Sequence, residues 1–164
     1  MILVEADVSK EWDRRTDWPA LAERSVRSAV AHSRHSGLGA ADVEVSVKFT
    51  SDDEVRSLNS AWRGKGRATN VLSFPMVEAA DLGSPAEPLL GDIVLAGGVC
   101  AAEAADKHVA VADHAAHLVV HGTLHLLGYD HETSEADAEE MEETERRALA
   151  AIGIADPYII EAHT

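Results

Sequence analysis

Three histidines lie within the eleven-residue segment HGTLHLLGYDH, which spans residues 121 to 131. His121 and His125 are four positions apart, and two such residues on a helix share one face, with Cβ atoms about 5–6 Å apart. Gly128 is suited to ending that helix in a left-handed conformation, after which the chain can bring His131 to the same point. Three neutral imidazoles that leave a fourth position open are typical of a catalytic zinc site.

The same spacing of histidines and glycine occurs in zinc peptidases whose motif is H-E-x-x-H-x-x-G-x-x-H. Those enzymes use the glutamate after the first histidine as the general base, and this chain has Gly122 at that position. The metal geometry is therefore retained while the proton acceptor is missing. The spacing predicts a metal site but argues against a peptidase.

Six further histidines lie elsewhere in the chain. His117, one turn before His121, extends the same stripe and could be a fourth ligand or a partner of a ligand. A straight helix seldom lets residues on three successive turns converge on one ion, which argues against a ligand role for His117. The remaining five are expected to be surface or structural residues: His32, His35, His108, His114 and His163.

The charge of the chain is strongly acidic, with a formal net charge of −15. A whole surface devoted to nucleic acid is therefore not expected, because phosphate binding draws on clustered Lys and Arg. The segment RGKGR (63 to 67) has three bases in five positions and could form a local basic site. Eight acids lie between residues 132 and 145 with no base among them, and we interpret this run as the solvated face of an amphipathic helix whose Met141 and Leu149 face inward.

Hydrophobic periodicity predicts strands over 2–8, within 42–51, over 69–76 and over 91–98. Helices are expected over 18–36, 52–62, 99–107, 111–127 and 134–153, and the tail 156–164 could add a short edge strand or remain irregular. The uneven alternation of strands and helices predicts an α+β fold, a small mixed β-sheet packed by helices, in a single domain over 1–164. Periodicity leaves the order of the strands open.

The sequence has one cysteine, Cys100, which excludes an intrachain disulfide and a Cys-rich metal site. Its small, apolar neighbours predict a buried side chain. No segment approaches the roughly 18 apolar residues of a membrane span, and charge at Glu5 comes too early for a signal peptide. A cytoplasmic protein is therefore expected.

Three segments together resemble the YbeY family of bacterial endoribonucleases, also called rRNA maturation factors: LNSAWRGKGRATNVLSFP (58 to 75), LGDIVLA (90 to 96) and HGTLHLLGYDH. The resemblance spans most of the chain. It implies a metal-dependent hydrolase of single-stranded RNA that acts in 16S rRNA 3′-end maturation and ribosome quality control. The implied partners are the 16S rRNA precursor and the small ribosomal subunit or its proteins, with no DNA and no membrane. We expect one Zn²⁺ per chain, in a cleft formed by the C-terminal helices.

The resemblance also assigns roles to individual residues. His121, His125 and His131 match the metal ligands of the family. Arg63 matches an arginine of the same cleft, and Asp92 matches the aspartate of the LGDI segment. The family segment usually reads TDVLSF, whereas this chain has TNVLSF. Asn70 retains a short acceptor for turning the backbone but lacks the charge, so we leave it outside the site.

These assignments suggest a mechanism of phosphodiester cleavage. A zinc ion lowers the pKa of a bound water toward about 7, which provides a nucleophile near neutral pH. The guanidinium of Arg63 could stabilise the charge that builds on the equatorial oxygens. Lys65 and Arg67 could hold flanking phosphates or could simply be solvated.

Several alternatives stay open. The RNA 2′-OH could replace water as the nucleophile, and either water or Asp130 could be the general acid. The protein could instead be a non-enzymatic ribosome-assembly factor that a metal ion stabilises, or a metal hydrolase of smaller phosphoesters. The sequence leaves the metal in vivo and the oligomeric state undetermined.

Overall fold

The computed structural model describes residues 1–64, 66, 68–85, 88–130 and 133–158, without the side chains of Arg63 and Ala79. Within these residues, four strands form one sheet in the order β1-β2-β4-β3. The strands β1 (Ile2–Val8), β2 (Val43–Thr50) and β4 (Leu89–Ala96) run parallel, and β3 (Val71–Pro75) pairs antiparallel with β4 at the edge. The predicted α+β class, with a small mixed sheet packed by helices, is confirmed.

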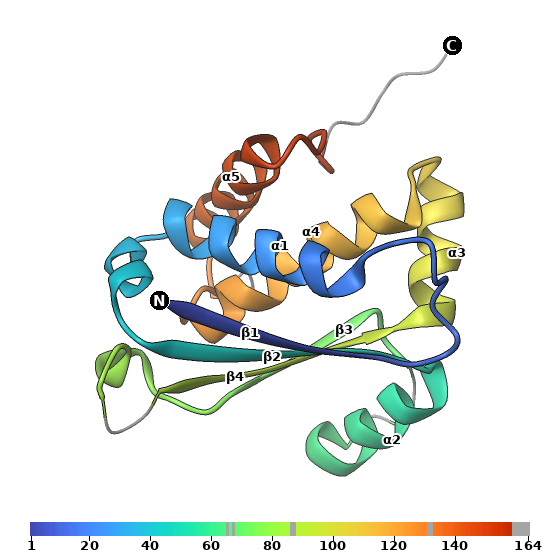
Figure 1. Cartoon of the computed structure of the whole chain (residues 1–164), viewed down its shortest axis with the longest axis horizontal. Helices are drawn as coiled ribbons and strands as arrows, with labels where there is room; N and C mark the ends of the chain where they lie inside the picture. The colour runs from blue at the N-terminus through green and yellow to red at the C-terminus, as the bar shows by residue number, and fades with distance from the viewer. Residues whose placement is uncertain (65, 67, 86–87, 131–132, 159–164) are drawn as a thin grey trace.

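The helices form layers on the two faces of this sheet (Figure 1). On one face, α1 (Trp18–His32) and α4 (Val111–Leu126) lie against the strands, and α5 (Glu135–Ala151) packs on both of these helices. On the opposite face lies α2 (Asp52–Arg63), and α3 (Gly97–Lys107) directly follows β4. No helix among the described residues is long and apolar enough to cross a membrane.

The main core fills the space between the sheet and the layer of α1 and α4. The predicted alternation along β2 is confirmed, since Val43, Val45, Val47 and Phe49 are buried while Glu44 is exposed. Trp12, Trp18 and Phe49 gather in mutual ring contacts with centroids 4.8 to 5.3 Å apart. This continuous apolar layer fixes α4, the helix that carries the histidine stripe, against the sheet.

A smaller core lies on the other face of the sheet, beneath α2. It contains Val55 of α2, Leu72 of β3, and Val94 and Ala96 of β4. The neighbouring β4 residues Ile93 and Leu95 belong to the main core. The strand β4 is therefore apolar on both faces, as expected for a strand covered on both sides.

Several predicted element boundaries differ from those of the structure. The strand predicted over 91–98 begins at Leu89 and ends at Ala96, because Gly97 and Gly98 start α3. A Cβ atom at Gly98 would lie 2.3 Å from Asp52 Oδ2, and Asp52 Oδ1 accepts a hydrogen bond of 3.1 Å from Val99 N. The glycine thus leaves room for the Asp52 carboxylate, which accepts from the first turn of α3.

The helix predicted over 18–36 ends earlier, at His32. The Ser33 hydroxyl donates to Val30 O at 2.7 Å and helps to end the helix, after which Ser36–Ala40 form a 3-10 turn. A second 3-10 turn, Ala79–Asp81, lies in the segment predicted to be a loop.

The C-terminal tail forms a turn rather than an edge strand as far as it is described, to Tyr158. Residues 159–164 lie outside the described part of the chain.

The single cysteine is buried on α3, as predicted. Burial, together with the nearby carboxylates of Glu103 and Asp52, raises the pKa of the Cys100 thiol to about 12. Because the thiolate is the reactive form of cysteine, this residue is a packing residue and not a nucleophile.

Candidate metal centre

Two of the three predicted ligands face each other on the last turns of α4. The Nε2 atoms of His121 and His125 lie 3.0 Å apart, and the ring centroids are 4.6 Å apart. Both rings are partly exposed in a cleft of about 590 Å³ whose walls include Ser73 and Asp130. The prediction that these two histidines share one helix face is confirmed.

The turn after α4 holds the second of these rings in place. Gly128 adopts a φ of 93°, the left-handed conformation that its position predicted. The turn is closed by a 3.0 Å hydrogen bond from Tyr129 N to Leu124 O, and Tyr129 O in turn accepts a 2.9 Å hydrogen bond from His125 Nδ1. The third predicted ligand, His131, lies outside the described residues.

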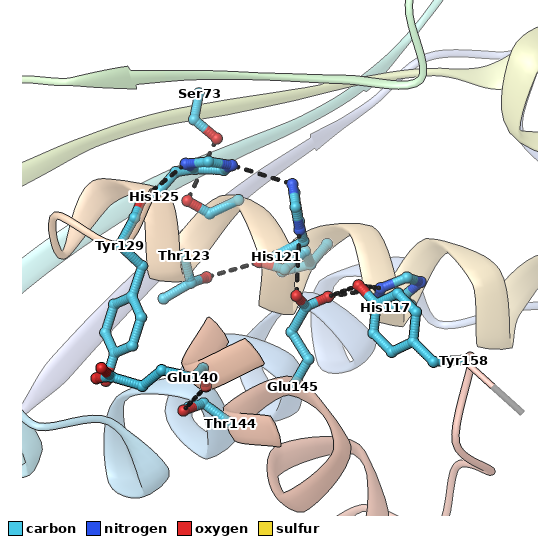
Figure 2. Close-up of polar contacts among 12 residues, drawn as sticks. Ser73, His117, His121, Thr123, His125, Tyr129, Glu140, Thr144, Glu145 and Tyr158 are labelled. Carbon is cyan, nitrogen blue, oxygen red and sulfur yellow. Dashed lines mark hydrogen bonds and ion pairs between the residues drawn. The ribbon is translucent and has the colours of Figure 1, made fainter. Parts of the chain in front are cut away.

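A buried carboxylate lies behind His121, on the side away from His125 (Figure 2). Glu145 of α5 is 1% exposed and accepts hydrogen bonds from three side chains. His121 Nδ1 is 3.4 Å from Oε2, while His117 Nε2 and the Tyr158 hydroxyl lie 2.6 and 2.8 Å from Oε1. The site is therefore built from α4, from α5 and from the segment that follows α5.

The charge state of this network follows from its contacts. Burial alone would raise the pKa of Glu145, but the hydrogen bonds from His117 and His121 outweigh it and lower that pKa to about 2. Burial and the neighbouring Glu145 carboxylate raise the pKa of Tyr158 well above its ordinary value. Near neutral pH, Glu145 is thus an anion and Tyr158 is a protonated donor to it.

The interpretation of the acidic run as a solvated helix face is correct in part. Met141 and Leu149 are fully buried, as predicted, but Glu145 is buried with them. Its position four residues after Met141 and four before Leu149 places it on the same inward stripe. This spacing could have identified Glu145 as a buried residue from the sequence. The surrounding acids instead suggested that it belongs to the solvated face.

The ring nitrogens of the facing histidines suit a metal ion. Because Tyr129 O and the Glu145 carboxylate can only accept, the Nδ1 atoms of His125 and His121 carry the protons. In the neutral rings both Nε2 atoms then present lone pairs to each other at 3.0 Å, an arrangement that needs a cation or a shared proton between them. Two nitrogen ligands of one tetrahedral zinc lie about 3.3 Å apart, so the pair fits a divalent metal ion.

A second set of donors lies next to this pair. Ligand atoms of His117, His121 and Glu145 fall within 4.8 Å of one another and could also hold a metal ion. The contact of 2.6 Å between His117 Nε2 and Glu145 Oε1 has the length of a charge-assisted hydrogen bond and is shorter than the separation of two zinc ligands. The distances thus favour the facing Nε2 atoms as the metal-binding side of His121.

The glycine that replaces the peptidase glutamate has a packing role. A Cβ atom at Gly122 would lie 2.9 Å from Ile93 Cγ2 and 3.0 Å from Ser73 Oγ. The Ser73 hydroxyl donates to Gly122 O at 3.2 Å. A side chain at position 122 would therefore require Ile93, Ser73 or α4 itself to shift.

The basic loop and its flanking residues are only partly described. Arg63 ends α2, but its side chain, Lys65 and Arg67 lie outside the described part. Asp92 pairs with Phe74 across β3 and β4 and lines a groove of about 860 Å³ beside α2. That groove is separate from the histidine cleft, although Ser73 and Pro75 border both.

Asn70, which we left outside the site, lines the histidine cleft. Its Oδ1 accepts a 2.7 Å hydrogen bond from Val71 N, the backbone-turning contact expected of a short acceptor. Its Nδ2 donates to Glu103 Oε1 at 3.0 Å, and the same oxygen is 2.8 Å from His114 Nε2. An aspartate could not donate to Glu103, so this contact depends on the amide.

The other histidines behave as predicted where they are described. His114 is buried and structural, His35 is half-buried, and His32 and His108 are exposed. His163 lies outside the described part of the chain. His117 contacts Glu145 and also belongs to the second set of donors, so its expected absence from the ion of His121 and His125 stays a prediction.

A pair of imidazoles that fits a divalent metal, at the open cleft of an α+β fold, defines a candidate metallohydrolase. The family model described as "Endoribonuclease YbeY" matches residues 8–153. The endoribonuclease YbeY of Novosphingobium aromaticivorans is 50% identical and covers 97% of each chain. That of Rhizorhabdus wittichii is 50% identical over 98% of each chain, and that of Zymomonas mobilis is 48% identical over 96% of this chain and 93% of its own.

A solved structure supports the same fold. The solution structure of a Thermotoga maritima protein superposes with a TM-score of 0.60 at 27% sequence identity, over 93% of this chain and 89% of that one. Because the family model and these relatives match nearly the whole chain, the protein belongs to the YbeY family of endoribonucleases.

Proposed function

We propose that this chain is a metal-dependent endoribonuclease that cleaves single-stranded RNA. The observation that supports this most directly is the pair of Nε2 atoms, 3.0 Å apart, that face an open cleft in a member of an endoribonuclease family. Within this proposal, residues 1–164 act as one hydrolase domain. The proposed substrate is the 3′ end of precursor 16S rRNA in the cytoplasm. The proposed role of the protein also includes ribosome quality control.

In this proposal His121, His125 and His131 hold one Zn²⁺. When bound, the ion would lower the pKa of a water molecule and withdraw charge from a phosphate oxygen. His125 is fixed for this task by the backbone of the glycine turn, and His121 by Glu145. These two ligands are thus preoriented, so they need little reorganisation when a phosphodiester enters the cleft.

Arg63 is proposed to stabilise the charge on the phosphoryl oxygens in the transition state. It ends α2, and the chain then returns through residues 64–70 to β3, which lines the cleft through Ser73. This connection is short, and Thr69 and Asn70 at its end line the cleft as well. The basic loop can therefore approach a strand that lies at the metal site.

The acidic surface bears on how the substrate is bound. With a net charge of −15, the protein should repel RNA except near the basic loop and the metal. We therefore expect weak, salt-sensitive binding of RNA by the isolated protein and propose that the small ribosomal subunit or its proteins add affinity. Tight binding that does not change between 50 and 200 mM salt would contradict this part of the proposal.

The experiment that tests the function compares the wild type with His125→Ala and with His32→Ala, an exposed histidine on α1. Bound metal is measured by mass spectrometry, and cleavage of single-stranded RNA is assayed on the same samples. We expect one metal ion in the wild type, and the joint loss of metal and cleavage only in His125→Ala. Cleavage that persists without metal would overturn the proposal.

One alternative has its own support in the structure. Glu145 links α5 to two histidines of α4, so a metal at this cluster could serve to hold helices together in a non-enzymatic ribosome-assembly factor. In that case metal-loaded wild type would cleave no RNA, while His121→Ala would lower the melting temperature. Turnover of mono- and dinucleotides on the same samples distinguishes a hydrolase of smaller phosphoesters.

A further inference from the structure

An imidazole ring has two nitrogens, and the structure engages both of those of His121. Its Nε2 faces His125 in the cleft, whereas its Nδ1 faces the Glu145 carboxylate inside the protein. A neutral imidazole carries one proton, on either nitrogen. Whichever group faces Nδ1 therefore decides whether the cleft side of His121 presents a lone pair to a metal or a hydrogen that repels it.

Glu145 is held so that one of its oxygens remains directed at His121. Its other oxygen, Oε1, accepts from His117 Nε2 at 2.6 Å and from the Tyr158 hydroxyl at 2.8 Å. These two donors approach from α4 and from the segment after α5, so the carboxylate cannot rotate without losing one of them. Figure 2 shows the carboxylate between the His121 ring and the pair formed by His117 and Tyr158.

The partner residues have properties that suit this role. His117 is buried, and its Nδ1 has no hydrogen-bond partner among the described residues. A buried N–H group without an acceptor is costly, so the proton of His117 belongs on the Nε2 that faces Glu145. Tyr158 is placed by its own backbone contact with Asp156, whose carboxylate pairs with Arg146 at 3.1 Å.

We propose that Glu145 is a positioning residue for the metal ligand His121. It fixes the proton on Nδ1, turns the Nε2 lone pair toward the cleft, and is itself oriented by His117 and by Tyr158. Outer carboxylates of this kind set the tautomer and ring orientation of metal-bound histidines. The inference rests on the proposed metal site, but it does not depend on RNA being the substrate.

The test uses the full chain with three substitutions on α5. Glu145→Met has a similar size and removes every acceptor, and Glu145→Gln keeps one neutral acceptor. Glu139→Gln changes an exposed acid of the same helix and is the matched control. Zinc affinity is measured by competition with a chelator, and folding is checked by circular dichroism and by thermal unfolding of the metal-free proteins.

We expect zinc affinity to fall about 10- to 100-fold in Glu145→Met, less in Glu145→Gln and not at all in Glu139→Gln. The side-chain ¹⁵N shifts of His121 should report a protonated Nδ1 in the metal-free wild type and a mixture of tautomers in Glu145→Met. The tautomer of His125 should not change, because its Nδ1 donates to the backbone of Tyr129.

Two results would overturn the proposal. One is a folded Glu145→Met variant with wild-type zinc affinity. The other is a metal-free wild type in which His121 is protonated on Nε2, a measurement that decides the question even if Glu145→Met does not fold. If the wild type binds zinc as expected but cleaves no RNA, the nuclease function fails while the role of Glu145 stands.

Discussion

The two sides of His121 differ in almost every physical respect. On the cleft side, its Nε2 faces His125 in a cavity of about 590 Å³ that reaches solvent. On the inner side, its Nδ1 faces a carboxylate that is 1% exposed. The facing histidines on the cleft side come from a short stretch of sequence, whereas the inner side is assembled from α5 and from the segment beyond it. The cleft side of His121 is thus open to metal and substrate, and the inner side holds its imidazole ring in position.

This difference predicts separable effects of mutation. Substitutions on the cleft side should change the rate of cleavage with little change in stability, because the partners of these residues are solvent, metal and substrate. Substitutions on the inner side should change metal affinity and stability together, because the partners of these residues are buried protein groups.

The largest effect is expected for Arg63→Glu, because we propose that this residue acts on the cleft side. Losing a group that stabilises transition-state charge reduces turnover about 100- to 1,000-fold, and the reversed charge adds repulsion of phosphate. Metal content and melting temperature should stay at wild-type values. The assay is single-turnover cleavage of single-stranded RNA, with Arg56→Glu, an exposed arginine of the same helix, as control. Equal losses in the two variants would show that only the net charge matters.

Gly122→Ala should have the next largest effect, at the contact between α4 and the sheet. The added Cβ atom would lie 2.9 Å from Ile93 Cγ2, so either the Ile93 side chain or α4 must shift. Overpacking of this kind lowers the free energy of unfolding by about 1–3 kcal/mol, measurable by urea denaturation. Gly37→Ala is the control because its site is open. An unchanged free energy in Gly122→Ala would mean that α4 can move at no cost.

Tyr158→Phe should have a smaller effect, confined to the inner side. It removes the hydroxyl that donates to Glu145 at 2.8 Å and leaves the ring in place. A hydrogen bond of this type contributes about 1 kcal/mol, so zinc affinity should fall about fivefold, less than in Glu145→Met. The measurement is chelator competition. A loss larger than that of Glu145→Met would place Tyr158, and not Glu145, at the centre of the network.

The smallest effect is expected for Glu143→Gln, two residues from Glu145 on the exposed face of α5. Glu143 pairs with Arg146 and Arg147 at 3.3 and 3.2 Å, and its side chain is 50% exposed. Exposed pairs contribute less than about 1 kcal/mol and are screened by salt. Urea denaturation at low and high salt should show a small change that disappears at high salt, with zinc affinity unaffected. A loss of zinc affinity would break the division between the two faces of the helix.

The same division explains how much of the site could be predicted from sequence. The cleft side follows from local geometry, since i and i+4 on a helix share a face and Gly128 adopts the left-handed conformation. The inner side depends on how α5 packs on α4, a tertiary contact between residues 24 positions apart. The stripe of Met141, Glu145 and Leu149 pointed inward, but no local rule says which neighbour a buried carboxylate meets.

The predictability of the fold shows the same contrast between local patterns and tertiary contacts. The positions of most strands and helices follow from periodicity, and the alternation along β2 was the strongest of these patterns. The order β1-β2-β4-β3 could not be predicted, because an apolar strand pattern does not specify its neighbour. The end of β4 at Ala96 coincides with the start of α3, where Val99 N donates to Asp52 of α2. The errors therefore lie where one element is determined by contact with another.

The most direct test of the account is to locate the metal. A crystal of the zinc-loaded protein, with anomalous diffraction recorded at the zinc edge, would show which side of His121 binds. We predict one peak about 2.0–2.1 Å from the Nε2 atoms of His121 and His125, with His131 as the third ligand and with Glu145 still bound to Nδ1. A peak among His117, Glu145 and the Nδ1 of His121 would contradict it.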